Sequence, residues 1–289
     1  MHNLMDKIYN SAILKAVSLC LVVGAFLAFT YANDDNYQLV STVPVEGKFM
    51  TTDFLKNSYV ITDRNQVMKY DSIGNLVGSF SESKFGIPTS VDATSPFNVL
   101  IFFKDFATAV TTDMRLNTRR LYKFSNIGIK NISAAALSND NYIWIYDEDE
   151  HRLKKINHDY ELVYQSLDIQ QLVGEEVHPN FIIERTIAEG QLVFLGIPNM
   201  GIIVFDVFGN YYTSIPNFSL QAENLDSFQI INDKIVYFFD GRVMVYDFFT
   251  KEITALNIPN TVGSNAINIE RGQLFLLGEK ELKLYSRTL

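Results

Sequence analysis

The chain has very few of the residues that form most metal and redox sites. Its 289 residues include one cysteine, Cys20, one tryptophan, Trp144, and four histidines. Cys20 lies within the first 32 residues, so the remainder can form no disulfide and offers no thiolate ligand. The histidines beyond that segment are His151, His158 and His178. They lack the close spacing of a zinc site on one element, so we expect structural or solvated histidines and no metal or other cofactor.

Basic residues are also scarce. The chain has 24 lysines and arginines against 33 aspartates and glutamates, and its formal net charge is −9. Binding to nucleic acid requires clustered positive charge that neutralises phosphates, so this balance argues against a nucleic-acid partner. The chain contains no Gly-x-Ser-x-Gly motif, no phosphate-binding loop and no dinucleotide fingerprint. We therefore expect no catalytic residues of these kinds.

Residues 1–32 have the features of a secretory signal. Lys7 and Lys15 supply positive charge, an apolar segment follows over 16–29, and small residues flank Tyr31 before a polar stretch begins. A retained anchor that holds the protein at the membrane is the alternative, and lipidation at Cys20 is a third reading. We expect an exported protein, periplasmic or associated with the outer membrane, whose mature domain spans 33–289.

A short strand pattern recurs along the mature chain. Each copy is an apolar run that ends in Asp, Asn or Ser. The final residues are Asp71, Asp113, Asn157, Asp206, Asp247 and Ser286, so the successive spacings are 42, 44, 49, 41 and 39 residues. A repeat of this length is typical of propellers and solenoids.

A more apolar run precedes each of these strands. The runs are 59–61, 99–103, 142–146, 192–195, 235–239 and 274–277. They are too short for helices, rich in β-branched and aromatic residues, and they do not alternate between polar and apolar positions. In a two-sheet sandwich one face of each strand would be polar, whereas a propeller blade is buried on both faces. The pattern therefore favours a propeller.

The strand count predicts how the ring closes. The last repeat supplies three strands, over 266–269, 274–277 and 282–285, and then the chain ends. The isolated strand 37–43 near the start has no partner beside it, and an unpaired outer strand in the last repeat would be an exposed edge. We predict an all-β, six-bladed β-propeller whose last blade is closed by the N-terminal strand.

The segment 59–80 resembles an NHL-type repeat. Thr62-Asp63, Tyr70-Asp71 and Gly74 stand in the positions that such repeats use, and 142–164 repeats the pattern in part. The resemblance implies the TolB-like six-bladed propeller superfamily, which contains receptors, scaffolds and enzymes alike. It therefore implies an architecture and leaves the activity open.

Two charged groups are candidate binding residues. The acidic run Asp147, Glu148, Asp149 and Glu150 lies between two strands of the third blade, where a solvated hairpin tip is the plainer interpretation and a docking point for a basic partner the functional one. Arg115, Arg119 and Arg120 lie in the outer hairpin of the second blade and could contact anions or carboxylates. The segment 96–110 and the run Phe181–Ile183 are strongly apolar, and we expect them in the core.

These observations favour a non-enzymatic protein that binds or scaffolds another protein of the cell envelope. Two alternatives remain. The first is a metal-dependent hydrolase, because the resemblance extends to lactonase-like propellers, which hold a metal in the central channel with Glu, Asn and Asp. The second is a binder of small ligands or glycans, which should show aromatic residues gathered at one mouth of the channel.

Overall fold

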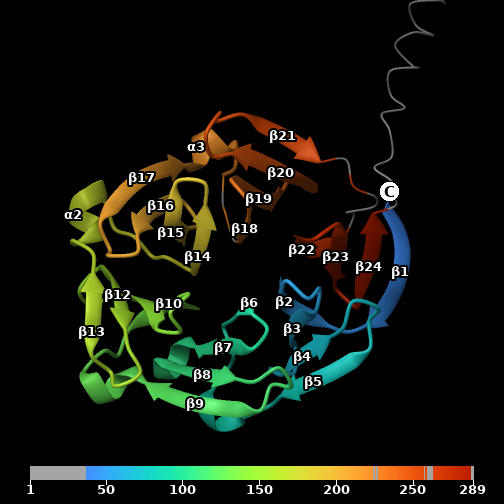
Figure 1. The fold of residues 1–289 in the computed structure, drawn as a ribbon, viewed down its shortest axis with the longest axis horizontal. Coiled ribbons are helices and arrows are strands. Elements are labelled where there is room, and N and C mark those ends of the chain that lie inside the picture. The colour runs from blue at the N-terminus through green and yellow to red at the C-terminus, as the bar shows by residue number, and fades with distance from the viewer. Residues whose placement is uncertain (1–36, 224, 226, 257, 259–262, 288–289) are drawn as a thin grey trace, which may run out of the picture.

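The computed structural model describes residues 37–223, 225, 227–256, 258 and 263–287, so the predicted signal segment lies outside the described residues. Six four-stranded antiparallel sheets are arranged in a ring around a central axis (Figure 1). This confirms the predicted all-β, six-bladed propeller. No helix among the described residues is long and apolar enough to cross a membrane.

Each blade is an antiparallel meander that runs outward from the axis. The inner strands are β2 (Gly47–Thr52), β6 (Ser90–Ser95), β10 (Ile132–Leu137), β14 (Phe181–Ile187), β18 (Phe228–Ile231) and β22 (Ser264–Glu270). The second strands are β3 (Ser58–Thr62), β7 (Asn98–Phe103), β11 (Ile143–Asp147), β15 (Gly190–Ile197), β19 (Lys234–Phe239) and β23 (Gln273–Gly278).

The repeated pattern of the sequence corresponds to the third strands. They are β4 (Val67–Tyr70), β8 (Thr108–Thr112), β12 (Arg152–Ile156), β16 (Gly201–Asp206), β20 (Arg242–Asp247) and β24 (Glu281–Arg287). The outer strands are β5 (Leu76–Phe80), β9 (Thr118–Lys123), β13 (Leu162–Gln165), β17 (Tyr211–Pro216), β21 (Ile253–Leu256) and β1 (Tyr37–Pro44). Three short 3-10 segments and the helices α2 (Ile169–Val173) and α3 (Asn217–Leu220) lie in the connections.

Strand β1 closes the ring, as the sequence predicts. It is the fourth strand of the sheet β1-β24-β23-β22, so the start and the end of the chain share blade 6 (Figure 1). The two strands are antiparallel, with Val43 opposite Leu282 and Tyr37 opposite Arg287. Val43 and Leu282 are both buried in a cluster shared with blade 1. Blade 6 is therefore completed by strand pairing between the two ends of the chain, and apolar clusters join it to blade 1 and to blade 5.

The core lies between the blades. Trp144 and Tyr146 of blade 3, for example, belong to the same buried cluster as Val193 and Leu195 of blade 4. Comparable clusters lie between the other neighbouring blades. Strands β3, β7 and β11 are buried on both faces almost throughout, which explains why their sequences do not alternate. The apolar segments 96–110 and Phe181–Ile183 lie largely in this core, as expected.

An aspartate closes the turn between the third and outer strands of several blades. Asp71 Oδ1 accepts hydrogen bonds from the backbone N–H groups of Ile73 and Asn75 at 3.0 and 2.8 Å, and its Oδ2 accepts one from Asn75 Nδ2 at 2.9 Å. Burial raises the pKa of the Asp71 carboxyl, but these hydrogen bonds outweigh burial and lower its pKa below the usual value. Asp113 and Asp206 repeat the arrangement with Asn117 and Asn210.

These turns also join one blade to the next. Gly74 has φ +91°, and a Cβ atom there would come within 2.6 Å of Ser41 Oγ on the outer strand of blade 6. Gly209, at φ +84°, approaches the backbone of Gln165 and Ser166 in the same way. A side chain at either position would separate neighbouring blades, so glycine is required both by the turn and by the close approach.

The turn of blade 3 provides a natural test of this geometry. Here Asn157 replaces the aspartate and Glu161 replaces the asparagine, so the side-chain bond runs in the opposite direction, from Asn157 Nδ2 to Glu161 Oε2 at 2.8 Å. We predict that Asp71→Asn alone lowers the free energy of unfolding by about 1–2 kcal/mol, because two amide donors then face each other. Asp71→Asn combined with Asn75→Glu should recover most of the loss.

Equilibrium denaturation by urea measures both variants against the unmodified protein. Equal stability of the single and the double variant would show that the side-chain bond of the turn contributes nothing.

Candidate functional site

The turns between inner and second strands surround one mouth of the central channel. We call the side of the ring that carries these turns face 1. A recess of about 600 Å³ opens here, and all six blades contribute to its lining. Its residues include Thr52, Thr94, Asn139, Arg185, Asn232 and Glu270. The volume falls within the range of typical small-molecule sites.

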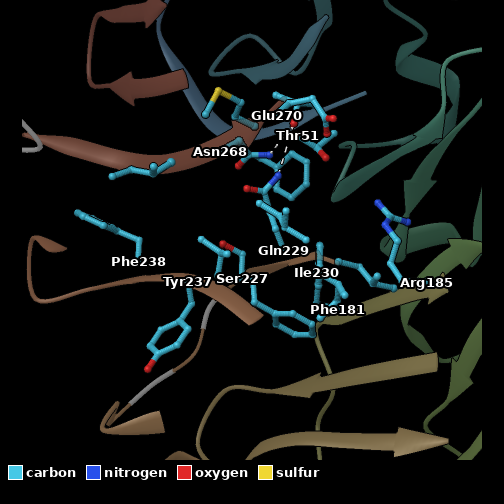
Figure 2. A pocket seen from close by; sticks show the side chains of 18 residues that line it. Thr51, Phe181, Arg185, Ser227, Gln229, Ile230, Tyr237, Phe238, Asn268 and Glu270 are labelled. Atoms are coloured by element: carbon cyan, nitrogen blue, oxygen red, sulfur yellow. Dashed lines mark hydrogen bonds between the residues drawn. The ribbon is translucent and has the colours of Figure 1, made fainter. Parts of the chain in front are cut away.

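Arg185 is the basic side chain that reaches deepest into this region. It lines the recess and also two smaller pockets further along the channel. Figure 2 shows Arg185 extending from β14 into the space between the inner strands, on the side away from Tyr237 and Phe238. The guanidinium group is therefore available to whatever occupies the channel mouth.

A buried carboxylate holds β14 in the orientation that points Arg185 toward the channel. Glu184 is 1% exposed and lies on the opposite side of the strand, against blade 3. Its Oε2 accepts hydrogen bonds from Ser138 Oγ at 2.6 Å and Trp144 Nε1 at 2.5 Å. Its Oε1 accepts hydrogen bonds from the backbone N–H of Asn139 at 3.0 Å and from the Gln191 side chain. Four donors thus satisfy a carboxylate that would otherwise be costly to bury.

The guanidinium of Arg185 is only partly engaged. Nη1 donates to Thr94 Oγ1 at 2.5 Å and to the backbone carbonyl of Glu184 at 3.0 Å. Among the described residues no carboxylate lies within ion-pair distance of this side chain. Burial lowers the pKa of Arg185, while the charges of Asp92, Glu270 and Glu184 oppose that effect.

Aromatic side chains lie at the same mouth. The rings of Phe54 and Phe97 are 6.2 Å apart, and the Arg271 guanidinium lies 5.4 Å from the centre of the Phe54 ring. Phe97 is half exposed. Of these two rings, Phe54 lines the recess and gives it an apolar surface beside its charged groups.

The acidic run of blade 3 lies away from this recess. It occupies the turn between β11 and β12, which in an antiparallel meander is on the face opposite to face 1. The expectation of a wholly solvated tip is wrong for Asp147, which is 2% exposed because its Oδ2 pairs with buried Lys154 at 2.7 Å. Glu150 contacts the same Lys154 Nζ at 2.9 Å, and Asp149 accepts a hydrogen bond from Asn131.

Glu148 of the same run pairs with His178 at 3.1 Å. Three of the four acidic residues therefore contact a lysine or a histidine of this chain, and Asp149 contacts an asparagine. A role for the run in binding a basic partner stays a prediction.

The three arginines lie in the outer hairpin of blade 2, as predicted. Arg115 belongs to the turn between β8 and β9, where its backbone packs against Gly78 of the neighbouring blade. Arg119 and Arg120 are exposed on β9, and Arg120 lies 5.7 Å from the centre of the Tyr122 ring. The structure does not bring them together with the acidic run. Their binding to anions also stays a prediction.

A second surface on the outer rim was not anticipated from the sequence. Five aromatic side chains of blades 3 to 5, each 37–55% exposed, form what we call the aromatic band: Tyr164, Phe208, Tyr211, Tyr212 and Phe249. Tyr164 and Phe208 are in edge-on contact across neighbouring blades, with ring centres 5.3 Å apart. Tyr212 stacks on the ring of Phe248, beside Phe249. Exposed apolar side chains that gather on one surface often mark a site of contact with another molecule.

The histidines lie away from the channel recess. His158 Nδ1 hydrogen-bonds to the hydroxyl of buried Tyr122 at 2.7 Å, and His178 pairs with Glu148 on the exposed surface. His158 thus has a structural role and His178 a solvated one, as expected, whereas the buried Nδ1 of His151 has no hydrogen-bond partner among the described residues. Within the described part of the chain, no three His, Cys, Asp or Glu residues are grouped closely enough to hold a metal ion.

Comparisons with known proteins identify an architecture. No family model matches the chain, and no curated protein matches it. Among solved structures, the WD40 domain of Neurospora crassa Pan2 is similar with a TM-score of 0.60 and 9% identity, over 89% of this chain and 97% of that domain. Virginiamycin B lyase from Staphylococcus aureus is similar with a TM-score of 0.57 and 10% identity, over 86% and 99%.

The extracellular domain of a putative hybrid two-component system from B. thetaiotaomicron is similar as well. Its TM-score is 0.53 with 13% identity, over 84% of this chain and 34% of that one. The likeness is one of fold alone. At these identities neither the lyase activity nor any other function of the similar proteins is established for this chain.

Sequence reasoning missed the central residues of the channel mouth. Glu184 and Arg185 occur in the strand sequence Phe-Ile-Ile-Glu-Arg-Thr-Ile, where two adjacent charges interrupt an otherwise apolar run. Such a pair inside a strand of a tightly packed ring is a signal for a buried polar contact, because uncompensated charges are not tolerated there.

The buried carboxylate can be tested directly. Glu184→Ala leaves four donors without their acceptor and should lower the free energy of unfolding by about 3 kcal/mol. Glu184→Gln keeps the shape but presents an amide donor to other donors, so it should cost roughly half as much. Trp144 is the only tryptophan in the chain, so its fluorescence reports on this contact during urea denaturation. A cost below 1 kcal/mol for the alanine variant, on the scale of a single net hydrogen bond, would contradict the assignment.

Proposed function

We propose that the protein is an exported, NHL-like propeller of the cell envelope that binds another envelope protein through the outer rim and face 1. The six blades form a rigid ring, so side chains on its surface are held in place before a partner arrives. Such preorganisation reduces the entropic cost of association. Neither catalysis nor nucleic-acid binding is part of the proposal.

The aromatic band is the observation that carries this proposal. Tyrosine and phenylalanine offer large contact areas at a low cost in side-chain entropy, and aromatic residues are enriched where proteins contact one another. The band lies on β13 and β17 and on the turns that follow β16 and β20, so it spans three blades. We propose that an apolar surface of the partner covers these rings, and that the outer strands provide an edge along which an extended segment could also align.

A matched pair of variants tests the band. The test variant replaces Phe208, Tyr211 and Phe249 by serine, and the control replaces Ile73, Leu76 and Val77 by serine. The control residues are equally exposed but belong to blade 1. Tagged forms of the full chain, which keep residues 1–32 so that export can take place, are recovered from mildly solubilised envelopes, and the co-purifying proteins are quantified by mass spectrometry.

We expect one co-purifying protein to fall at least tenfold with the band variant and to remain with the control. Losing three aromatic contacts from an interface removes enough binding free energy for such a change. Recovery of the same proteins in the same amounts with both variants would remove the basis of the proposal.

A further inference from the structure

The open donors of Arg185 indicate a ligand. A guanidinium group carries five N–H donors, and only Nη1 is engaged here. Nε and Nη2 have no protein partner among the described residues, and the half-buried side chain lines the recess, so these donors are open to its contents. A carboxylate can accept both of them in parallel through charge-assisted hydrogen bonds, which are stronger than those of a neutral acceptor. The geometry of the channel mouth therefore fits a ligand that carries a carboxylate.

The carboxylates of the chain itself do not fill this role. Asp92 Oδ1 accepts hydrogen bonds from the backbone N–H and the hydroxyl of Thr94, and its Oδ2 accepts one from the backbone N–H of Leu137 at 2.7 Å. Glu270 lies 3.6 Å from Arg271 Nε. Both act on Arg185 through their charge, but neither is within ion-pair distance of it.

The charges around the recess decide whether a simple carboxylate or a zwitterionic ligand fits better. Among the residues that line the recess and the small pocket beside it, Arg185 and Arg271 carry two positive charges, and Asp92 and Glu270 carry two negative ones. A simple anion would bring a third negative charge beside Asp92 and Glu270, and like charges at short range repel. A ligand with one charge of each sign keeps the balance, with its cationic end next to Glu270. Burial already raises the pKa of the Glu270 carboxyl, so a neighbouring ammonium group would stabilise its charged form.

Part of the remaining wall of the recess is apolar, and Thr52, Asn139 and Asn232 are among its polar residues. Phe54, Ile230 and Ile269 face it beside the polar groups. An apolar substituent on the ligand would bury surface there, and the volume of about 600 Å³ accommodates a molecule of the size of an amino acid with space for water.

We propose that the channel mouth binds a free α-amino acid with an apolar side chain. Its carboxylate pairs with Nε and Nη2 of Arg185, its ammonium group lies beside Glu270, and its side chain rests against Phe54 and the neighbouring isoleucines. This site is separate from the aromatic band, and it stands whether or not the band binds a partner.

Three matched probes separate the two charges. Titration calorimetry of the mature chain, 33–289, is performed with L-phenylalanine, with 3-phenylpropionate, which lacks the ammonium group, and with 2-phenylethylamine, which lacks the carboxylate. A parallel set uses L-leucine, 4-methylpentanoate and 3-methylbutylamine. We expect at least one of the two amino acids to bind with a dissociation constant at least tenfold lower than those of its two analogues.

Variants then assign each charge to a residue. Arg185→Gln should raise the dissociation constant of the amino acid at least tenfold. It should leave the dissociation constant of the amine unchanged, because the amine does not contact the guanidinium group. Glu270→Gln should raise the dissociation constant of the amino acid at least tenfold. The dissociation constant of the carboxylate analogue should stay the same or fall. Arg120→Gln, an arginine on the outer rim, is the control and should leave all affinities unchanged. Trp144 fluorescence verifies that each variant is folded.

Two results would overturn the proposal. One is the absence of saturable binding by either amino acid to the unmodified chain. The other is an affinity of a carboxylate analogue equal to that of its amino acid, which would show that the ammonium group and Glu270 do not contribute.

Discussion

The pairing of β1 with β24 is the constraint on which the rest of the structure depends. Five blades are continuous in sequence, and the sixth combines three C-terminal strands with one strand from the beginning of the chain. Only a closed ring leaves no blade with an uncovered face, because each blade is then packed between two neighbours. Each buried cluster then joins two neighbouring blades. The cluster that contains Val43 and Leu282 joins the last blade to the first.

Closure also determines what the inner strands can present. Since the blades are fixed relative to one another, side chains from different blades meet at the axis with little freedom to adjust. Thr52 of blade 1, Gln229 of blade 5 and Asn268 of blade 6 come within hydrogen-bond distance in this way. Glu184 bonds to three residues of blade 3 from its position in blade 4. Arg185 thereby reaches the channel from a strand that cannot rotate, as a preorganised binding group requires.

Much of the fold could be predicted because the repeated sequence pattern reflects contacts between residues that are close together in the chain. The aspartate at the end of the third strand in blades 1, 2 and 4 closes the turn that follows, and blade 3 shows that asparagine with glutamate serves as well. The isolated strand at 37–43 could be assigned to blade 6 by counting strands. Residues 1–36 lie outside the described part of the chain, so export and anchoring stay predictions.

The candidate sites could not be predicted in the same way, because burial in a propeller depends on partners from other blades. Asp147 looks like part of a solvated acidic run, and only its contact with buried Lys154 shows otherwise. Glu184 and Arg185 are adjacent and charged, yet one is a buried acceptor and the other lines the channel. Tyr211 and Phe205 are both aromatic residues of blade 4 strands, and nothing local distinguishes the exposed one from the buried one.

Cysteine cross-linking measures the closure of the ring most directly. In a Cys20→Ser background, Thr42→Cys and Lys283→Cys place thiols on residues that face each other across β1 and β24. The account predicts a disulfide on mild oxidation and a higher melting temperature, since the bond closes a loop of nearly the whole chain. Thr42→Cys with Ser286→Cys is the control, because Ser286 lies opposite Gln38. Cross-linking of neither pair, or of both pairs equally, would contradict a ring closed in this register.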